Sequence, residues 1–224
     1  MPVKAEKKPI HFFDGFIEGV SEFWKSRNIP FLFEKQNGSV VITGYKDSLL
    51  PKTEIPSAIR GLPVKKIGSR AFLQCDFIEE AILSDGIEEI AANAFSSCDR
   101  LTKIHMADSV RSIGRNAFFE CENLFDVGLS ALLQTLGDRA FFGCVGLRDI
   151  TLPDSLKSIG EQAFYGCRKL RSIRMPLSLR SLPRNTFDGC ILLDDIYLEK
   201  GSYADAVLSQ SDHLSKKLRY IPRI

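Results

Sequence analysis

The stretch Ile159-Gly-Glu-Gln-Ala-Phe-Tyr-Gly-Cys167-Arg-Lys-Leu-Arg-Ser-Ile-Arg-Met-Pro-Leu-Ser-Leu-Arg-Ser-Leu182 decides how this chain folds, because its pattern returns along most of the sequence. The clearest marker is cysteine, which recurs every 23 residues at Cys75, Cys98, Cys121, Cys144, Cys167 and Cys190. All six cysteines of the chain belong to this series. The sequence is therefore an internal repeat, and units this short must stack on their neighbours to bury a core.

Apolar residues keep a fixed distance from each cysteine, and their alternation predicts a strand. In one unit Leu147, Ile150 and Leu152 point inward, while Asp149 and Thr151 point outward. The corresponding positions of the other units are also apolar. We therefore expect one short strand per unit, and the repeated strands should form a parallel sheet.

Other columns of the repeat predict how each unit turns. Leu156 and Ile159 form a second inward pair, which favours a second and shorter strand. The Ala-Phe pair before each cysteine favours a helical turn that places the phenylalanine in the core. Glycine at positions such as Gly160 indicates a bend with little room for a side chain. Proline at Pro153 and Pro176 should end strand pairing, because it has no N–H group.

Written as a rule, the unit reads Ile-Gly-x-x-Ala-Phe-x-x-Cys-x-x-Leu-x-x-Ile-x-Leu-Pro-x-Ser-Leu-x-x. This string resembles the BspA-like, or treponemal-type, leucine-rich repeat family, and the resemblance covers about residues 40 to 224. It implies an α/β fold, a right-handed leucine-rich-repeat solenoid with a parallel sheet on its concave face. It also implies a bacterial interaction protein, since members are associated with adhesion to host matrix proteins or to other bacteria.

We expect a single structural domain in three parts. Residues 1–39 would form an N-terminal cap, residues 40–198 a solenoid of one irregular first repeat plus six 23-residue units, and residues 199–224 a C-terminal cap. Apolar residues between Phe12 and Trp24 fall at helical spacing and predict an amphipathic cap helix. The alternative is a helix that lies on a membrane surface or binds a partner, which would need an exposed aromatic face.

Both ends carry further local signals. Apolar runs on either side of Asn37-Gly38 predict a β-hairpin. Near the C-terminus, Ser202 and Asp205 form a capping-box pair for a short helix. The segment 218–221 then reads as a last strand. Such ends would protect the apolar interior of the stack from water and from strand addition.

Composition excludes several classes of partner. The chain has 224 residues, 44% hydrophobic and 26% charged, and its 30 basic and 28 acidic residues leave a net charge of +2. A charge this small argues against nucleic acid or an anionic membrane as a partner. No apolar run approaches the ~20 residues of a membrane span.

The sequence leaves the compartment open. Residues 1–8 are charged, and no apolar signal core follows them. Either the protein is not exported by that route, or its signal was removed and a new methionine supplied. The family resemblance, in contrast, implies a cell-surface or secreted protein.

The cysteines could be disulfides, free thiols or metal ligands. Adjacent strands are close enough for a disulfide bridge, but parallel side-chain vectors in one column disfavour it. We expect buried free thiols that make weak S–H contacts with backbone oxygens. A metal site is not expected, because there is no Cys-x-x-Cys and His11, His105 and His213 lie far apart in sequence.

The sequence gives no sign of an enzyme or of a bound cofactor. It contains no Gly-x-Ser-x-Gly elbow, no phosphate-binding loop and no His-Glu-x-x-His helix. Acidic pairs such as Asp194 and Asp195 read as solvated strand faces. Repeat proteins act instead through a long, rigid surface.

Two surfaces are candidates for binding a protein. The first is the outward face of the predicted strands, five and seven residues after each cysteine, where residue type varies while the inward columns do not. Its members are Glu80, Ile82, Lys103, His105, Asp126, Gly128, Asp149, Thr151, Ser172, Arg174, Asp195 and Tyr197. The second is a patch of three aromatic residues on the opposite side, Phe119, Phe142 and Tyr165. The first set could also be plain soluble surface, and the second could simply cover the turns.

We therefore predict a non-catalytic protein–protein interaction module, adhesin-like in the sense that it binds host matrix or other proteins through the repeat surface. A structural scaffold or assembly subunit inside the cell or periplasm is the alternative. It is consistent with the missing export signal and with reduced cysteines. The sequence does not decide the oligomeric state.

Overall fold

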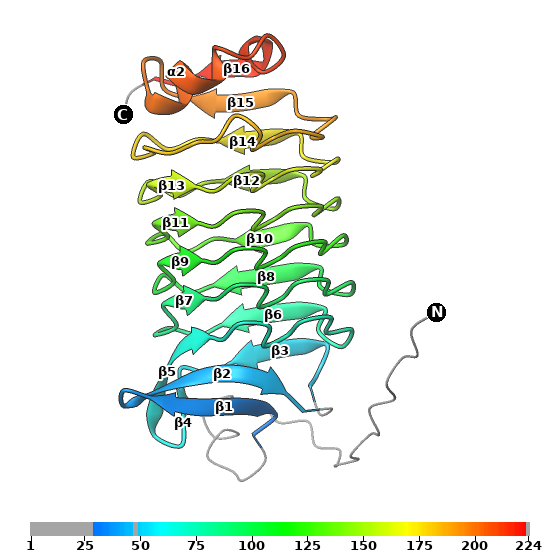
Figure 1. The fold of residues 1–224 in the computed structure, drawn as a ribbon, viewed down its shortest axis with the longest axis vertical. Helices are drawn as coiled ribbons and strands as arrows, with labels where there is room; N and C mark the ends of the chain where they lie inside the picture. Colours follow the sequence, from blue (N-terminus) through cyan, green and yellow to red (C-terminus); the bar gives the residue numbers. More distant parts are fainter. Residues whose placement is uncertain (1–28, 47–48, 223–224) are drawn as a thin grey trace.

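The computed structural model describes residues 29–46 and 49–222. Within them the chain forms an elongated solenoid whose strands stack in two columns along the long axis (Figure 1). Helix in this part of the chain is limited to α2 (Tyr203–Leu208) and the 3-10 helix η1 (Ser215–Lys217). The expected solenoid is present, but it is a β-solenoid with little helix rather than an α/β structure, because turns connect its strands.

The first column contains the longer strands. It consists of two four-stranded parallel sheets with the orders β10-β8-β6-β3 and β12-β14-β15-β16. The bounds are β3 Lys52–Ile55, β6 Glu80–Leu83, β8 Lys103–Met106, β10 Asp126–Gly128, β12 Asp149–Thr151, β14 Ser172–Arg174, β15 Asp195–Leu198 and β16 Leu218–Tyr220. Between β6 and β8 each residue pairs with the one 23 positions later, as Glu80 does with Lys103. Residues at the same position of successive repeats therefore lie side by side across the sheet.

The second column contains mostly two-residue strands in the order β1-β2-β5-β7-β9-β11-β13, with β4 beside β5. The bounds are β1 Phe31–Gln36, β2 Ser39–Tyr45, β4 Ala58–Ile59, β5 Leu62–Ile67, β7 Glu89–Ile90, β9 Ser112–Ile113, β11 Thr135–Leu136 and β13 Ser158–Ile159. The second strand predicted for each unit is therefore confirmed at β13. The hairpin is confirmed too, since β1 and β2 are antiparallel and Asn37 and Gly38 between them have φ of 47° and 74°.

The column of longer strands is interrupted in the middle of the described chain, where β10 and β12 are not paired. Earlier in the solenoid, pairing continues one residue past the strand. The N–H groups of Ser84 and Ala107 donate to the carbonyls of Ile55 and Leu83, at 3.0 and 3.1 Å. Pro153 occupies the equivalent place after β12 and has no N–H group to donate. The proline therefore removes the bond that follows the strand, as predicted. It does not account for the gap between β10 and β12, because β14 pairs on both sides although Pro176 follows it in the same way.

The inward columns form one continuous core between the two strand columns. Its largest feature is a row of stacked phenylalanine rings with neighbouring centroids 4.8 to 5.9 Å apart. The row consists of Phe72, Phe95, Phe118, Phe141, Phe164 and Phe187. Two of the longer strands depart from the inward pattern. At β10, Val127 and Leu129 are partly buried rather than buried, and at β16 Leu218 is partly buried and Tyr220 is exposed.

The cysteines form a second buried row, and all six are free. The Sγ atom of Cys121 donates to the carbonyl oxygen of Phe95 at 3.0 Å. The same bond, to a carbonyl 26 residues earlier, is made by Cys98, Cys144, Cys167 and Cys190. The expected contacts between thiols and backbone oxygens are confirmed, and no disulfide forms.

The segment around each Ala-Phe pair is a set of tight turns, so the predicted helical turn is wrong. The Ala71 N–H donates to Gly68, three residues earlier, whereas the Phe72 N–H donates to Ala94 of the next unit at 2.7 Å. Arg70, just before Ala71, has φ of 61°, in the left-handed region. Alternate N–H groups therefore serve their own turn and the neighbouring unit, which a helix does not allow.

The predicted close approach at the glycine column is confirmed. A Cβ atom at Gly137 would lie 2.6 Å from the backbone nitrogen of Arg115, and one at Gly160 would lie 2.3 Å from the backbone nitrogen of Asp138. These distances are too short for any side chain. Glycine is needed here for space between neighbouring units rather than for an unusual backbone angle.

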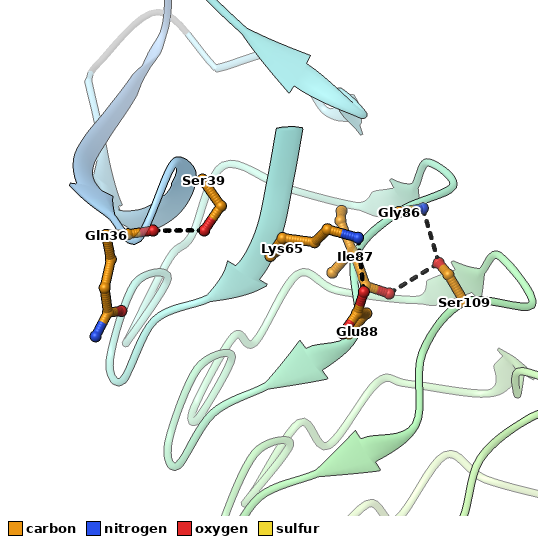
Figure 2. A network of polar contacts seen from close by, with 7 residues as sticks. All are labelled: Gln36, Ser39, Lys65, Gly86, Ile87, Glu88 and Ser109. Atoms are coloured by element: carbon orange, nitrogen blue, oxygen red, sulfur yellow. Dashed lines mark hydrogen bonds and ion pairs between the residues drawn. The ribbon is translucent and has the colours of Figure 1, made fainter. Parts of the chain in front are cut away.

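The serine of the repeat rule links consecutive units (Figure 2). Ser109 donates to the carbonyl of Ile87 at 2.8 Å and accepts a hydrogen bond from the N–H of Gly86 at 3.0 Å. Ser155 and Ser178 donate to the carbonyl 22 residues earlier, both at 2.6 Å. The serine that recurs in the repeat thus supplies a hydrogen bond between units.

The two ends of the solenoid differ from its middle. The predicted cap helix between Phe12 and Trp24 lies outside the described residues. In the described part, the ring of Tyr45 stacks on Phe72 with centroids 5.8 Å apart and extends the phenylalanine row by one ring.

At the C-terminal end, α2 begins after Ser202, whose side chain accepts from the Asp205 N–H at 3.2 Å. The Asp205 carboxylate accepts from the Gly201 N–H at 2.8 Å, one residue before the position that a reciprocal capping box uses. Finally, β16 pairs in parallel with β15, so the predicted last strand is present.

Candidate protein-binding face

The residues predicted for the first candidate surface all lie on the outward side of β6, β8, β10, β12, β14 and β15, which we call the longer-strand face. None of them is buried. The register pairs them across neighbouring strands: Ser172 pairs with Asp149 on one side and Asp195 on the other, and Arg174 pairs with Thr151 and Tyr197 in the same way. The structure therefore brings the predicted residues into two adjacent rows, apart from the interruption between β10 and β12.

Several charges on this face already have partners within the protein. Glu80 forms an ion pair with Lys52 at 2.9 Å, and this hydrogen bond lowers the pKa of the Glu80 carboxyl. Asp195 pairs with Arg219 at 2.8 Å. Asp149 accepts a hydrogen bond from Ser172 at 2.6 Å. The charges of Glu80 and Asp195 are thus partly neutralised by cations of the protein itself, whereas Asp149 keeps its charge.

The longer-strand face differs in its side chains and its shape on the two sides of the gap between β10 and β12. On its N-terminal side the Lys103 ammonium lies 6.0 Å from the ring centre of Phe125, in a cation–π contact. His105 lies beside Gly128, where an added Cβ would come 3.1 Å from its Nδ1 atom. Gly128 therefore leaves a position without a side chain, and the imidazole borders it.

On the C-terminal side of the interruption the face is hollowed. A shallow pocket of about 350 Å³ brings together five of the predicted residues, Asp149, Thr151, Ser172, Arg174 and Tyr197, with Ile150 and Ile221. Ile221 follows β16 and was not predicted as part of this surface. The sequence indicates the strand that ends before Ile221 but not that Ile221 lies beside this pocket.

A second hollow of about 530 Å³ lies over the shorter strands. Its lining includes the glycine column and a row of small hydroxyl residues, Ser112, Thr135, Ser158 and Ser181. The sequence indicates that the glycines form bends, but it does not reveal this depression. The absence of side chains at Gly114, Gly137 and Gly160 accounts for the open space.

The alternative aromatic patch is a second stacked row outside the core. Ring centroids of Phe119 and Phe142 are 5.0 Å apart, and those of Phe142 and Tyr165 are 4.8 Å apart. Arg139 covers the Phe142 ring at 5.9 Å. All three rings are partly buried. They therefore cover the turns, and only part of each ring is accessible to a partner.

The thiols are poorly suited to chemistry. Burial raises the pKa of Cys75, Cys144 and Cys167, which keeps them in the neutral form. Among residues 29–46 and 49–222 no cluster of three or more His, Cys, Asp or Glu is placed to hold a metal ion. In the same residues, no helix has the length and apolar character needed to cross a membrane.

Comparison with known proteins agrees with this architecture. The sequence model of the protein family described as the BspA-type leucine-rich repeat region matches residues 45–144 and 123–214 of this chain. A leucine-rich repeat protein from Treponema pallidum is 31% identical, with a TM-score of 0.72, over 75% of this chain and 78% of that one. A leucine-rich repeat protein from Bacteroides ovatus is also 31% identical, with a TM-score of 0.68, over 76% of this chain and 46% of that one.

A leucine-rich cell surface protein from Faecalibacterium prausnitzii is 28% identical, with a TM-score of 0.59, over 79% of this chain and 39% of that one. No curated protein matches the sequence. The family model covers well over half of the chain, and its six copies agree with the 23-residue spacing. The chain belongs to the BspA-type leucine-rich repeat family.

Proposed function

We propose that this protein is a non-catalytic binding module that recognises a protein partner through the longer-strand face. One observation carries the proposal: outward residues differ in charge and size from strand to strand, while the core columns beneath them repeat. A rigid array of unlike side chains at regular spacing is suited to binding an extended surface of another protein. Leucine-rich repeat proteins are in general protein-interaction modules.

The adhesin-like form of this proposal has the partner outside the cell, among host matrix proteins or the surfaces of other bacteria. The cell-surface relative from Faecalibacterium prausnitzii supports it. This chain spans less than half of that protein, so the proposal concerns the repeat region only.

A structural scaffold or assembly subunit inside the cell is the second candidate. It is favoured by the six cysteines, all of them free and buried. Disulfides are common in oxidising compartments and rare in the cytosol. Fractionation of the native cells, with antibody detection of the protein, separates the two candidates because only an adhesin is found at the surface.

The binding face can be tested with two double variants of equal charge change. Lys103→Glu with Arg174→Glu reverses two charges on the longer-strand face. Arg111→Glu with Arg180→Glu reverses two exposed charges in the same two units, thirteen residues after their cysteines and away from that face. Purified host matrix proteins are immobilised, and binding of the wild type and both variants is measured by surface plasmon resonance.

We expect the first variant to lose binding and the second to retain it, with melting temperatures showing that both are folded. Equal binding by the two variants would count against the longer-strand face. Failure of every matrix protein to bind, together with a location inside the cell, would favour the scaffold.

A further inference from the structure

We propose that Arg174, Thr151 and Tyr197 form a subsite for a carboxylate, supplied by an aspartate or glutamate side chain of an acidic protein segment. This inference rests on the proposed function and specifies the chemistry of the partner. It concerns the pocket at the C-terminal end of the longer-strand face.

The register places these three side chains next to one another. Thr151 pairs with Arg174 in the β12–β14 ladder, and Arg174 pairs with Tyr197 in the β14–β15 ladder. Residues paired in this way project from the same face, about 4.8 Å apart between strands. The guanidinium therefore comes from the middle strand, with one hydroxyl-bearing side chain on either side, and all three line the same pocket.

Charge pairing within the protein leaves this arginine available. Asp195 pairs with Arg219, and Asp149, which lines the same pocket, accepts from Ser172 and keeps its negative charge. Within residues 29–46 and 49–222 the exposed Arg174 makes no ion pair or side-chain hydrogen bond. The hydroxyls of Thr151 and Tyr197 are likewise without a hydrogen-bond partner in that part of the chain.

The shape and donors of this group fit a carboxylate. A guanidinium presents parallel N–H donors that match the two oxygens of a carboxylate, and such charge-assisted bonds are stronger than neutral ones. The hydroxyls on either side can donate to the same oxygens. Ile150 and Ile221 supply an apolar part of the lining, which reduces competition from water.

Charge along the chain restricts the ligand to a short acidic segment rather than a long polyanion. Residues 144–189 carry eight Lys and Arg against four Asp and Glu, a net charge of +4. The preceding residues 75–143 carry five against twelve, a net charge of −7. A sulfated polysaccharide or nucleic acid that extended along the solenoid would meet this negative stretch. A single acidic side chain in a protein segment would not.

The test uses the full-length protein and a short probe, the peptide acetyl-Gly-Glu-Tyr-Glu-Gly-amide, at low ionic strength. Binding by the wild type and by every variant is followed by the backbone amide NMR resonances of residues 149–151, 172–174 and 195–197. In the wild type the arginine Nε–Hε resonances are followed as well. We expect the Arg174 resonance to shift with saturation, and Arg174→Gln to weaken binding about fivefold. Arg174→Lys should restore only part of it, because a lysine lacks the planar pair of donors.

Arg180→Gln is the matched control, because it removes the same charge from the same unit. Its guanidinium donates to the carbonyls of Leu177 and Leu179, both at 2.8 Å, and does not line the pocket. We expect this variant to bind the peptide like the wild type. A peptide with glutamine in place of both glutamates should leave the Arg174 resonance unmoved.

Three results would overturn the inference. These are equal binding of the glutamine peptide, an equal loss in Arg180→Gln, or tighter Arg174-dependent binding of a sulfated oligosaccharide than of the peptide. The proposed function fails separately. If the matrix-protein assay depends on the longer-strand face but the peptide does not bind, only the carboxylate inference is wrong. If neither assay depends on that face, both are wrong.

Discussion

The Sγ atom of Cys144 donates to the carbonyl oxygen of Phe118, 3.1 Å away and 26 residues earlier in the chain. The bond joins two units, and it adds a second donor to a carbonyl that also accepts from the Cys121 N–H at 3.3 Å. Because it recurs along the stack, the cysteine row has a structural role. Cysteine is small enough to fit and still provides a donor.

The buried thiols should make stability fall at alkaline pH. Burial raises the pKa of Cys144 and Cys167 above the ~8.5 of an unfolded thiol, so only the unfolded chain loses these protons just above that pH. The contribution of these thiols to the free energy of unfolding is complete below pH ~8.5. Above that pH it declines, by up to about 1.4 kcal/mol per pH unit for each thiol.

Urea unfolding under reducing conditions between pH 7 and 9.5 measures this dependence. The double variant Cys144→Ala with Cys167→Ala should be less stable at pH 7 and show a shallower decline. An identical slope in variant and wild type would mean that other groups cause the decline.

Two adjacent phenylalanines should differ sharply in their importance for stability. Phe141 is fully buried in the inner row, whereas Phe142 is only partly buried in the outer row. We expect Phe141→Ala to reduce the free energy of unfolding by about 4 kcal/mol, and Phe142→Ala by about 1 kcal/mol. Thermal and urea unfolding of both variants provides the comparison, and losses of similar size would show that the outer row is part of the core.

The glycine column should not tolerate a methyl group. In Gly160→Ala the new Cβ would meet backbone atoms of Gly137 and Asp138, which cannot move without disturbing the preceding unit. We expect a loss of about 3 kcal/mol. Ala91→Gly, a change in the opposite direction in the same column, should cost only about 1 kcal/mol. If Gly160→Ala unfolds like the wild type, the spacing between units is more adaptable than the structure indicates.

Most of the stack could be predicted because each unit repeats the same constraints. The cysteine spacing sets the register, and period-two alternation such as Ile150 and Leu152 on either side of Thr151 identifies a strand in every unit. A residue that recurs at the same spacing six times is much stronger evidence for a repeat than a motif that occurs once. The hairpin at Asn37 and Gly38 could also be predicted, since both positions require a positive φ.

The turns could not be predicted correctly because their hydrogen bonds are divided between units. An Ala-Phe-x-x-Cys segment has helical spacing, but the Phe72 N–H donates to Ala94 in the next unit rather than within its own. Local sequence does not reveal that partner. The same limit applies to the gap between β10 and β12 and to the place of Ile221 beside the pocket, both of which depend on stacking.

The central claim about the fold is that its repeated interior is inert packing. A thiol titration of the native protein, followed by denaturation without reductant, tests it most directly. We predict little reaction in the native state and six reactive thiols after unfolding, in agreement with six free buried cysteines. Fewer than six thiols after unfolding, or rapid reaction of the native protein, would contradict the account.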